Sequence, residues 1–391
     1  MVKIAVIGAG ASGCFAAAEL GRLLPEARIV LYEAGKVPMA KLALTGGGRC
    51  NLSNTFESVG NLRDVYPRGA RLMERLFHSF SPKETAEWFR REGIRLKVES
   101  GGRIFPESDD AMQVVRTLES ILRRQGAEIR TGSPVRDISL LDADRILVAT
   151  GGGALALLSP LSIATEPPVP SLFTFRTDDS ALRALSGTTA QTVRLKIPGT
   201  QVEAEGPLLL TDWGFSGPAA LTLSSRGARL LADRQYRSPL LVSWITDGEQ
   251  QIRALLGQTA AEHSRKMVVN TPVGGLSERL WAHLALRSGL RPDTRWAEIG
   301  SKGFARLVAT LSSDLHEITG RVRFKEEFVT CGGVSLPEVN PATLSCRKRP
   351  DIFFAGEVLD IDAVTGGFNL QAAWTTGRVA AQGIAKSLQE Q

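Results

Sequence analysis

Long hydrophobic runs are absent from this sequence of 391 residues, and cysteine and histidine are scarce. No apolar stretch reaches the roughly 18 residues of a membrane span, and no charged and then apolar leader precedes the first predicted strand. The four cysteines and four histidines show no C-x-x-C or other metal-ligand spacing, which argues against a zinc site and a disulfide framework. We therefore expect a cytoplasmic protein with no membrane or metal partner, whose chemistry comes from an organic cofactor.

A large excess of charge of either sign is also missing. The net charge is +6 and the pI is near 9.3. The basic residues occur in small groups, such as Arg90-Arg91, Arg123-Arg124 and Arg347-Lys348-Arg349. Two explanations of this moderate basicity are equally good: an ordinary solvated surface, or a face that binds a polyanion such as RNA. Both interpretations stay open at the level of composition.

The first 34 residues contain the most informative pattern. An apolar run over residues 3–7 predicts a strand buried on both faces, and G-x-G-x-x-G follows over residues 8–13. A helical pattern over residues 14–24 leads to a second apolar run over residues 28–32, and Glu33 stands twenty residues beyond the last glycine of the motif. The order strand, glycine turn, helix, strand and acid predicts a dinucleotide-binding unit.

Each part of this pattern has a physical reason. Gly8 allows the tight turn, Gly10 lets the backbone approach a pyrophosphate, and Gly13 lets the helix pack closely on the strand. Glu33 would accept hydrogen bonds from ribose hydroxyls, which disfavours a 2′-phosphate. FAD and NAD both satisfy this pattern. The alternative is a glycine turn that only joins packed elements.

Two further glycine-rich stretches lie in the first half of the chain. Residues 45–54, Thr-Gly-Gly-Gly-Arg-Cys-Asn-Leu-Ser-Asn, predict a polar loop whose bare backbone can lie against a flat or anionic ligand, and they lack the ending of a P-loop. Residues 145–153 predict a buried strand that ends in glycines. No helix with a downstream acid follows it, so we do not interpret it as a second dinucleotide fingerprint. Amphipathic helices are predicted over residues 68–92 and 109–125, with a hairpin over residues 101–106 between them.

The middle of the chain has a different pattern of apolar and polar residues. From about Pro167, short alternating runs separated by Pro and Gly predict an antiparallel β subdomain, and residues 247–316 predict several helices. Strands are expected to resume near residues 321–329. We therefore divide the chain into a dinucleotide-binding domain (1–167 and 330–391), a β subdomain (168–246 and 318–329) and a helical subdomain (247–317).

The last segment returns to the first domain. Residues 350–357 predict a buried strand that ends in Gly356-Glu357, and Gly366-Gly367 open a helix of small residues that runs to about Lys386. A helix that begins in this way can direct free N–H groups and its positive end at the anionic edge of a reduced flavin.

These motifs resemble the BaiN/YhiN-like (BaiN/RdsA) FAD-dependent oxidoreductases over essentially the whole chain. The resemblance rests on GAGASG, TGGGRCNLSN, GRIFPES, FSGPAAL, FVTCGGV and FFAGEVLDIDAVTGGFNLQAAWTTG. It implies an α/β fold: a glutathione-reductase-like FAD-binding Rossmann domain with an inserted antiparallel β subdomain and a helical subdomain. Members of the family are variously aminoacetone-oxidase-like, linked to bile-acid reduction, or ribosomal RNA dihydrouridine synthases that use FAD and NADH.

The sequence departs from the family pattern at two places. The family usually has Thr-His before the Gly-x-Ser-Gly-Pro stretch, whereas Thr211 is followed here by Asp212-Trp213, so this chain lacks that histidine as an acid or base. Cys331 stands where the family more often has a small or basic residue, and we interpret it as structural.

We predict a catalytic role for Cys50, as the donor of the proton that must accompany hydride transfer to a carbon–carbon double bond. A small buried residue packed beneath the flavin is the alternative for Cys50, and water is an alternative donor. The residues predicted to bind FAD are Gly8, Gly10, Ser12, Gly13, Glu33, Ala34, Lys41, Gly47, Gly48, Arg49, Asn51, Val135, Thr150, Gly151, Gly356, Glu357, Asp360, Gly366, Gly367, Phe368, Asn369 and Leu370.

The predicted function is an oxidoreductase in which NAD(P)H, bound transiently, reduces FAD and the hydride passes to a substrate. A uridine of 23S ribosomal RNA, reached through a basic surface, is the candidate substrate. A small ketone, amine or enone is the first alternative, and a flavin-loaded RNA-binding module without turnover is the second.

Overall fold

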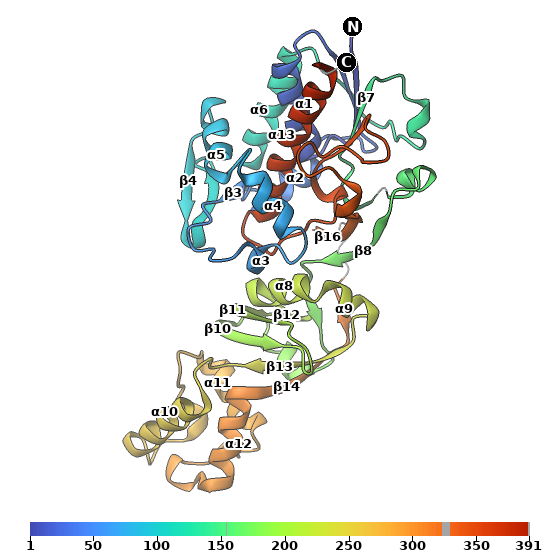
Figure 1. Ribbon diagram of the computed structural model, residues 1–391. Coiled ribbons are helices and arrows are strands. Elements are labelled where there is room, and N and C mark those ends of the chain that lie inside the picture. The colour runs from blue at the N-terminus through green and yellow to red at the C-terminus, as the bar shows by residue number, and fades with distance from the viewer. Residues whose placement is uncertain (154, 323–328, 390–391) are drawn as a thin grey trace. The chain divides into compact units, whose positions relative to one another are not determined.

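The structure is a computed structural model that describes residues 1–153, 155–322 and 329–389 (Figure 1). The chain forms two compact units, one of Met1–Val169 with Phe328–Gln391 and the other of Pro170–Glu327. We call them the cofactor unit and the insert. The β subdomain and the helical subdomain that we expected separately lie together in the insert, because one cluster of buried residues spans both.

A five-stranded sheet with the order β17-β7-β1-β2-β6 forms the centre of the cofactor unit, and every pairing in it is parallel. Its strands are β1 (Lys3–Ile7), β2 (Arg28–Tyr32), β6 (Glu128–Arg130), β7 (Arg145–Val148) and β17 (Ile352–Phe354). Ile4 of β1 pairs with Ile29 of β2 on one side and with Arg145 of β7 on the other. A strand with neighbours on both sides and covered faces is apolar along its length, as predicted for residues 3–7.

The helices of the cofactor unit are α1 (Ala11–Leu23), α2 (Ala40–Leu44), α3 (Leu62–Val65), α4 (Ala70–Phe77), α5 (Pro82–Arg91), α6 (Ala111–Arg124) and α13 (Phe368–Gln389). Figure 1 shows α1 and α13, from opposite ends of the chain, side by side. They approach closely because Gly377 has no side chain: a Cβ there would lie 2.9 Å from the Ser12 carbonyl oxygen. The last segment of the chain thereby completes the first domain.

The helix expected over residues 68–92 is divided into α4 and α5. Ser81 caps α5, since its hydroxyl accepts from Glu84 N at 3.3 Å while its own N–H donates to the Glu84 carboxylate at 2.7 Å. Pro82, at the first helical position, cannot continue α4. Two small sheets complete the unit. The first is antiparallel and consists of β3 (Ser53–Asn54), β4 (Leu96–Glu99) and β5 (Arg103–Pro106); the second pairs β8 (Thr165–Ser171) with β16 (Val329–Val334).

The insert contains a seven-stranded antiparallel sheet with the order β14-β13-β10-β11-β12-β9-β15. Its strands are β9 (Phe175–Arg176), β10 (Thr189–Lys196), β11 (Glu203–Leu210), β12 (Gly214–Ser216), β13 (Ser238–Ser243), β14 (Asp314–Ile318) and β15 (Gly320–Arg321). Its helices are α7 (Ser180–Arg183), α8 (Gly217–Arg226), α9 (Ala228–Asp233), α10 (Glu249–Glu262), α11 (Glu278–Arg287) and α12 (Gly300–Ser313).

Two expectations for the insert differ from the structure, and a third lies mostly outside the described residues. The helical region ends earlier than predicted, because residues 314–318 form β14, whose side chains alternate between buried and exposed. The sequence reading also missed α8 and α9, which follow β12 where strands alone were expected. The strand expected near residues 321–329 falls mostly on residues outside the described part of the chain.

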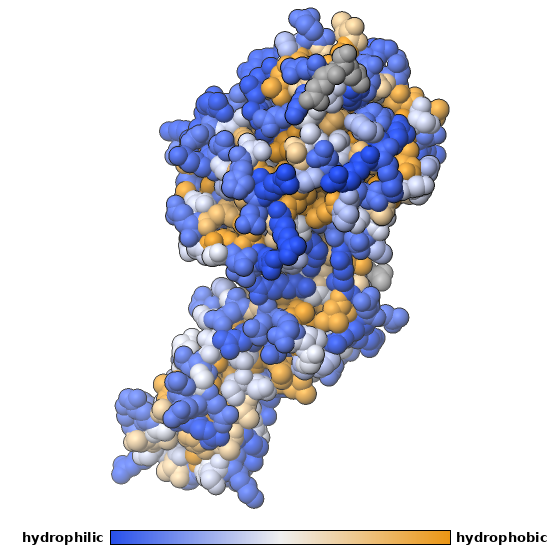
Figure 2. Space-filling view, in the orientation of Figure 1, coloured by the Kyte–Doolittle hydropathy of each residue, from blue (hydrophilic) through white to orange (hydrophobic). Residues whose placement is uncertain are grey.

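The visible face of the protein is mostly hydrophilic, with scattered apolar residues (Figure 2). Among the described residues, no helix has the length and apolar character needed to cross a lipid bilayer.

Candidate functional site

The turn between β1 and α1 is shaped by three glycines, each for a different reason. Gly8 has φ +101°, and a Cβ there would lie 2.4 Å from the Ala149 carbonyl oxygen. A Cβ on Gly13 would lie 2.0 Å from the Gly8 oxygen, so strand and helix could not pack. A Cβ on Gly10, by contrast, would meet no protein atom within 4 Å. Gly8 and Gly13 are therefore required by packing, whereas Gly10 keeps space open beside the start of α1.

A cavity of about 340 Å³ lies against this turn, entirely within the cofactor unit. Many of the predicted cofactor residues line it, although they come from distant parts of the sequence. They are Gly8, Gly10, Ser12, Glu33, Lys41, Thr150, Gly151, Gly356, Glu357, Asn369 and Leu370. The carboxyl ends of β1, β2, β7 and β17 meet at this edge of the sheet, which is where parallel sheets bind ligands.

Glu33 is held in place at the end of β2. Its Oε2 accepts from Ala9 N at 2.9 Å, and its Oε1 accepts from Gly35 N at 2.7 Å. A carboxylate has about four acceptor positions, so two remain for ribose hydroxyls. The glycine turn and the acid predicted to bind the ribose are thus joined by a hydrogen bond.

Glu357 is a second acid at the cavity, in the short 3-10 helix that follows β17. Its Oε1 accepts from Thr330 N at 2.8 Å. Burial raises the pKa of Glu357, while Lys41 and the hydrogen bonds from Thr330 act in the opposite direction. Lys41 also lines the cavity, so a cation lies beside this partly buried acid.

The glycine-rich loop after α2 lies outside this lining, except for its first residue, Thr45. Gly47 and Gly48 do not line the cavity, and Arg49 forms ion pairs with Glu99 and with Asp109, the latter at 2.8 Å. The Arg49 guanidinium also stacks over Phe105, 4.3 Å from the ring centroid. These partners hold Arg49 against β4 and β5. The hydrogen bonds from the two carboxylates raise its pKa.

Cys50 is fully buried and has a left-handed backbone with φ +60°. It does not line the cavity, although its hydrogen-bond partner Thr45 does. Burial raises the pKa of the Cys50 thiol to about 12. The role of proton donor stays a prediction, and this burial favours the packing alternative, since buried apolar thiols are inert.

Gly366 and Gly367 shape the entrance to α13. Gly367 has φ +92°, and a Cβ there would lie 2.3 Å from the Ser53 oxygen. The Asn51 amide joins the same backbone, accepting from Gly367 N at 3.0 Å and donating to Ser53 O at 3.1 Å. Neither glycine lines the cavity, but Asn369 and Leu370 in the first turn of α13 do. The glycines thus set the direction of the helix, and its first turn borders the cavity.

The remaining predicted residues lie elsewhere. Gly13 packs inside the turn, Ala34 is exposed, and Asp360 and Phe368 do not line the cavity. Val135 lines a separate cavity of about 370 Å³ with Tyr32, Leu140 and Leu141 among others. Sequence reasoning missed several lining residues, namely Ala9, Ala11, Val37, Met39, Ala40, Leu42, Thr45, Ala149, Val329, Ile361, Ala372 and Ala373. Most are small or apolar and carry no chemical signal of their own.

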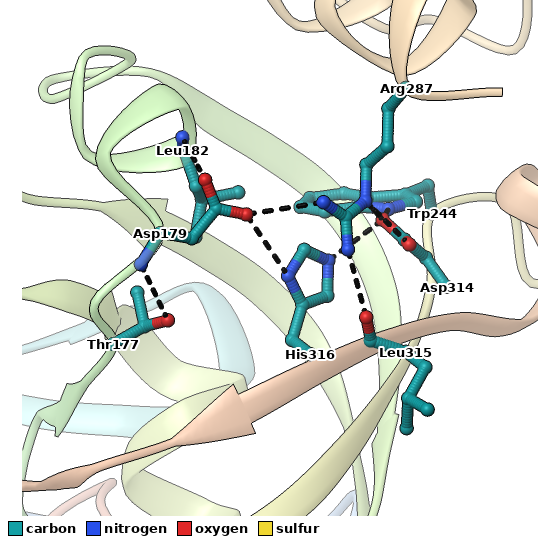
Figure 3. A network of polar contacts seen from close by, with 8 residues as sticks. All are labelled: Thr177, Asp179, Leu182, Trp244, Arg287, Asp314, Leu315 and His316. Carbon is teal, nitrogen blue, oxygen red and sulfur yellow. Dashed lines mark hydrogen bonds and ion pairs between the residues drawn. The ribbon is translucent and has the colours of Figure 1, made fainter. Parts of the chain in front are cut away.

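A second polar cluster lies inside the insert (Figure 3). Asp314 accepts from Trp244 Nε1 at 3.0 Å and from Arg287 Nε at 2.8 Å, and His316 Nε2 lies 2.7 Å from it. Arg287 also donates to Asp179 at 3.1 Å. Burial alone would raise the pKa of Asp314, but these hydrogen bonds lower it. With its carboxylate fully engaged, we interpret this cluster as structural.

The whole insert and most of the cofactor unit match one family of proteins. The HI0933-like protein Rossmann domain matches residues 2–383. The chain belongs to this family. The expected resemblance is confirmed, and so is the predicted fold class, a Rossmann-type FAD-binding domain with an inserted antiparallel sheet.

Three relatives match nearly end to end. The 3-dehydro-bile acid delta(4,6)-reductase of Clostridium scindens is 28% identical over 99% of this chain and 100% of its own length. The ribosomal RNA dihydrouridine synthase of Escherichia coli is 26% identical over 97% of both chains. The enzyme of the same name from Haemophilus influenzae is 25% identical over 97% of this chain and 98% of its own.

Solved structures resemble the chain more distantly. The 3-ketosteroid delta1-dehydrogenase of Sterolibacterium denitrificans has a TM-score of 0.47 at 10% identity, covering 99% of this chain and 100% of the other. The quinol fumarate reductase subunit FrdA of E. coli has a TM-score of 0.46 at 13% identity, covering 99% of this chain and 71% of the other.

The residues of this HI0933-like chain fit FAD on geometric grounds. The open space at Gly10 admits a pyrophosphate, the first turn of α1 supplies free N–H groups, and Glu33 has acceptor positions for a ribose. The absence of a basic residue in place of Glu33 suits a ribose without a 2′-phosphate.

Proposed function

We propose that this chain is an FAD-dependent reductase that takes hydride from NAD(P)H and delivers it to a carbon–carbon double bond in a uridine of 23S ribosomal RNA. The observation that carries the proposal is the cavity at the carboxyl edge of the parallel sheet, where Gly10 leaves room for a pyrophosphate and Glu33 is positioned for a ribose. When bound there, FAD supplies the hydride transfer.

The chain's own groups bind and orient the cofactor. The N–H groups at the start of α1 and its positive end stabilise the pyrophosphate, and the Glu33 carboxylate accepts from the adenosine ribose. Asn369, which also lines the cavity, holds the loop before α13 by accepting from Ala363 N and donating to Ala363 O, both at 2.9 Å. The first turn of α13 is thereby fixed with its positive end beside the cavity, where it favours an anionic ring edge.

NAD(P)H binds transiently in this proposal. The sequence has a single G-x-G-x-x-G in the setting of a dinucleotide fingerprint, and that one is assigned to FAD. Reducing one double bond consumes one hydride from NAD(P)H and one proton. Cys50 and water are the two candidate proton donors.

Ribosomal RNA is favoured as substrate by two relatives and by charge. Two of the near full-length relatives are named ribosomal RNA dihydrouridine synthases. The insert, residues 170–327, carries 20 Lys and Arg against 16 Asp and Glu, a net charge of +4, whereas the larger cofactor unit has 27 against 25, a net charge of +2. A positive insert suits a polyanionic substrate. The relative named a bile acid reductase supports a small enone as the second candidate, for which this charge would be incidental.

Two measurements test the proposal. Purified protein mixed with NADH or NADPH without oxygen should lose its yellow flavin absorbance, which a module without turnover would not do. In a strain that lacks the gene, mass spectrometry of 23S rRNA should show one dihydrouridine missing, restored by the wild-type gene and not by Gly10→Val. Unchanged rRNA in the deletion strain, with NAD(P)H-driven reduction of an added steroid enone by the purified protein, would overturn the RNA substrate in favour of the second candidate.

A further inference from the structure

Trp213 differs from the other tryptophans of this chain by its exposure. It is 52% exposed, whereas Trp88, Trp244, Trp281, Trp296 and Trp374 are at most 6% exposed. Burial of a tryptophan stabilises a fold, so a tryptophan held in water forgoes that contribution. A single exposed apolar residue is ordinary by itself. What sets Trp213 apart is the structure around it.

The turn that carries Trp213 joins β11 to β12 and is fixed by its own hydrogen bonds. Thr211 N donates to Gly214 O at 2.8 Å, and Gly214 N donates to Thr211 O at 3.1 Å. Trp213 is tied on both sides, since its N–H donates to Thr211 Oγ1 at 3.3 Å and its carbonyl accepts from Thr177 N at 3.0 Å. A ring on a fixed turn loses little conformational freedom when a flat ligand stacks on it.

Two arginines lie beside this turn. The Arg176 guanidinium carbon is 6.0 Å from the Trp213 ring centroid, and Arg176 pairs with Gly214 across β9 and β12, so no side chain stands opposite it. Arg183 donates from Nε to the Asp212 carbonyl oxygen at 2.7 Å. Within the described residues, neither arginine forms an ion pair with a carboxylate. Both positive charges are therefore available to a ligand.

We propose that Trp213, Arg176 and Arg183 form a binding site for single-stranded RNA, in which an unpaired base stacks on the Trp213 ring and the arginines contact the flanking phosphates. The site deepens the proposed function and rests on it, because it would help to hold an RNA substrate. Single-stranded RNA is recognised by stacking on aromatic and arginine planes together with cationic contacts to its backbone. The chemistry of this turn supplies both.

Charge distinguishes RNA from an apolar partner here. A protein or lipid surface that only covered Trp213 would leave the two guanidinium groups without a negatively charged partner, whereas phosphates provide one. Asp212 is also exposed on this turn and opposes phosphate binding. Asp212→Asn removes that negative charge while the carbonyl that accepts from Arg183 remains. We therefore expect Asp212→Asn to bind RNA more tightly.

The test measures binding of the FAD-loaded protein to a fluorescently labelled oligouridylate of about ten nucleotides, within the usual range of single-strand binding sites. Trp213→Ala should weaken binding between about 5- and 150-fold, corresponding to about 1–3 kcal/mol of base stacking, and Trp213→Phe should restore most of it. Leu315→Ala is the matched control, because Leu315 is also a large exposed residue of the insert, at 55%. It should bind like wild type.

Salt dependence separates the roles of the ring and the arginines. Arg183→Ala should lower the slope of log affinity against log salt by about 0.7, the value for one phosphate contact on a single strand, and Trp213→Ala should leave the slope unchanged. Because the other tryptophans are buried, RNA should also quench the intrinsic fluorescence through Trp213. Equal RNA affinity of wild type, Trp213→Ala and Arg183→Ala would overturn the site.

Failure of this site is distinguishable from failure of the proposed function. If wild type binds the oligouridylate and the variants bind equally well, RNA is held elsewhere, and the deletion-strain assay still decides the substrate. If wild type binds no RNA and the deletion strain keeps its dihydrouridine, both proposals are wrong. A lipid vesicle of neutral phosphatidylcholine should not bind; binding to it with equal loss in Trp213→Ala would reassign the ring to a membrane surface and overturn the RNA site.

Discussion

The two units of this protein build their polar sites in opposite ways. In the cofactor unit the cavity depends on side chains that are missing, since Gly10 leaves open the space in which a pyrophosphate would lie. In the insert, the internal cluster depends on side chains that are present, with Asp314 engaged by Trp244, Arg287 and His316. A site made by the backbone can admit a ligand, whereas a site whose donors and acceptors satisfy each other stabilises the fold. This difference between the two sites predicts which substitutions remove FAD and which lower the stability of the fold.

The largest effect is expected for Gly10→Val. The backbone at Gly10 has φ −84°, which any residue adopts, and the added side chain meets no protein atom, so the fold should persist. The valine would fill the space of the pyrophosphate, and we expect the protein to be purified with almost no FAD. Absorbance at the flavin band, measured against protein concentration, checks this.

The control for Gly10→Val is the thermal unfolding of wild-type protein stripped of FAD. The variant and the stripped wild type should unfold at the same temperature. A variant that retains a full complement of FAD would show that the pyrophosphate lies elsewhere.

Asp314→Ala should have the opposite effect: it should lower the free energy of unfolding and leave the affinity for FAD unchanged. Removing one partner of a buried charged cluster costs about 3–5 kcal/mol, because Arg287 Nε, His316 Nε2 and Trp244 Nε1 would lose the carboxylate that they share. Urea unfolding followed by tryptophan fluorescence checks the free energy of unfolding. Glu249→Ala, which breaks only an exposed pair with Arg253, should cost less than about 1 kcal/mol. Equal effects of the two variants would refute the structural role.

The same cluster predicts a pH dependence. The pKa of Asp314 is lowered in the folded protein from its ordinary value of 3.8. Its contribution is therefore present above that value and is lost as the pH falls through the lowered pKa. Wild type should lose stability toward acid faster than Asp314→Asn, whose amide does not titrate. The comparison of unfolding free energies between neutral and acidic pH measures this difference, and parallel curves would contradict it.

The cavity of the cofactor unit could be predicted from the sequence, and the polar cluster of the insert could not. The first is built on a local backbone motif, whereas the second depends on side chains from distant parts of the sequence. The turn at Gly8 and Gly13 was predicted from a local pattern, the spacing of the glycines directly after a strand. The structure has this turn at the expected residues. Arg287 donates to both Asp314 and Asp179, which lie 27 and 108 residues away in the sequence, and no local pattern predicts these contacts. Long-range pairing of this kind is set by tertiary packing.

Arg49 shows the same limit inside the cofactor unit. Its neighbours in sequence, a glycine-rich loop, favoured a role at the cofactor, but the structure pairs it with Glu99 of β4 and with Asp109 in the turn before α6, 50 and 60 residues away. The helices α8 and α9 were missed because a short apolar run that packs on a sheet has the composition of a strand. Local motifs therefore predicted the glycine turn, whereas the ion pairs of Arg49 depend on residues far away in the sequence; a role for Arg49 at the cofactor stays a prediction.

Cys50→Ala tests the catalytic hypothesis with a smaller effect. Because the thiol is buried and its pKa is raised to about 12, we expect packing to be its main role and the variant to lose about 1 kcal/mol of stability. Stopped-flow measurements should then find flavin reduction by NADH and substrate reduction within a few-fold of wild type. A selective loss of about 100-fold in substrate reduction would instead establish Cys50 as the proton donor. Cys14→Ala, at another buried cysteine of the same unit, is the control.

The smallest effect is expected for Gly257→Ala, on the exposed side of α10 in the insert. A Cβ there meets no atom within 4 Å, as at Gly10, but Gly257 lies in mid-helix rather than beside a cavity. Alanine restricts the unfolded chain and favours the helix, so the insert should gain about 0.4–1 kcal/mol of stability with FAD content unchanged. Gly13→Ala, in α1, should be destabilising because its Cβ would lie 2.0 Å from the Gly8 oxygen. The same exchange of glycine for alanine thus stabilises one helix and disrupts the other, and urea unfolding of both variants measures the two signs. If Gly257→Ala lowered the FAD content, open space at a glycine would not by itself distinguish a surface helix from a cofactor site.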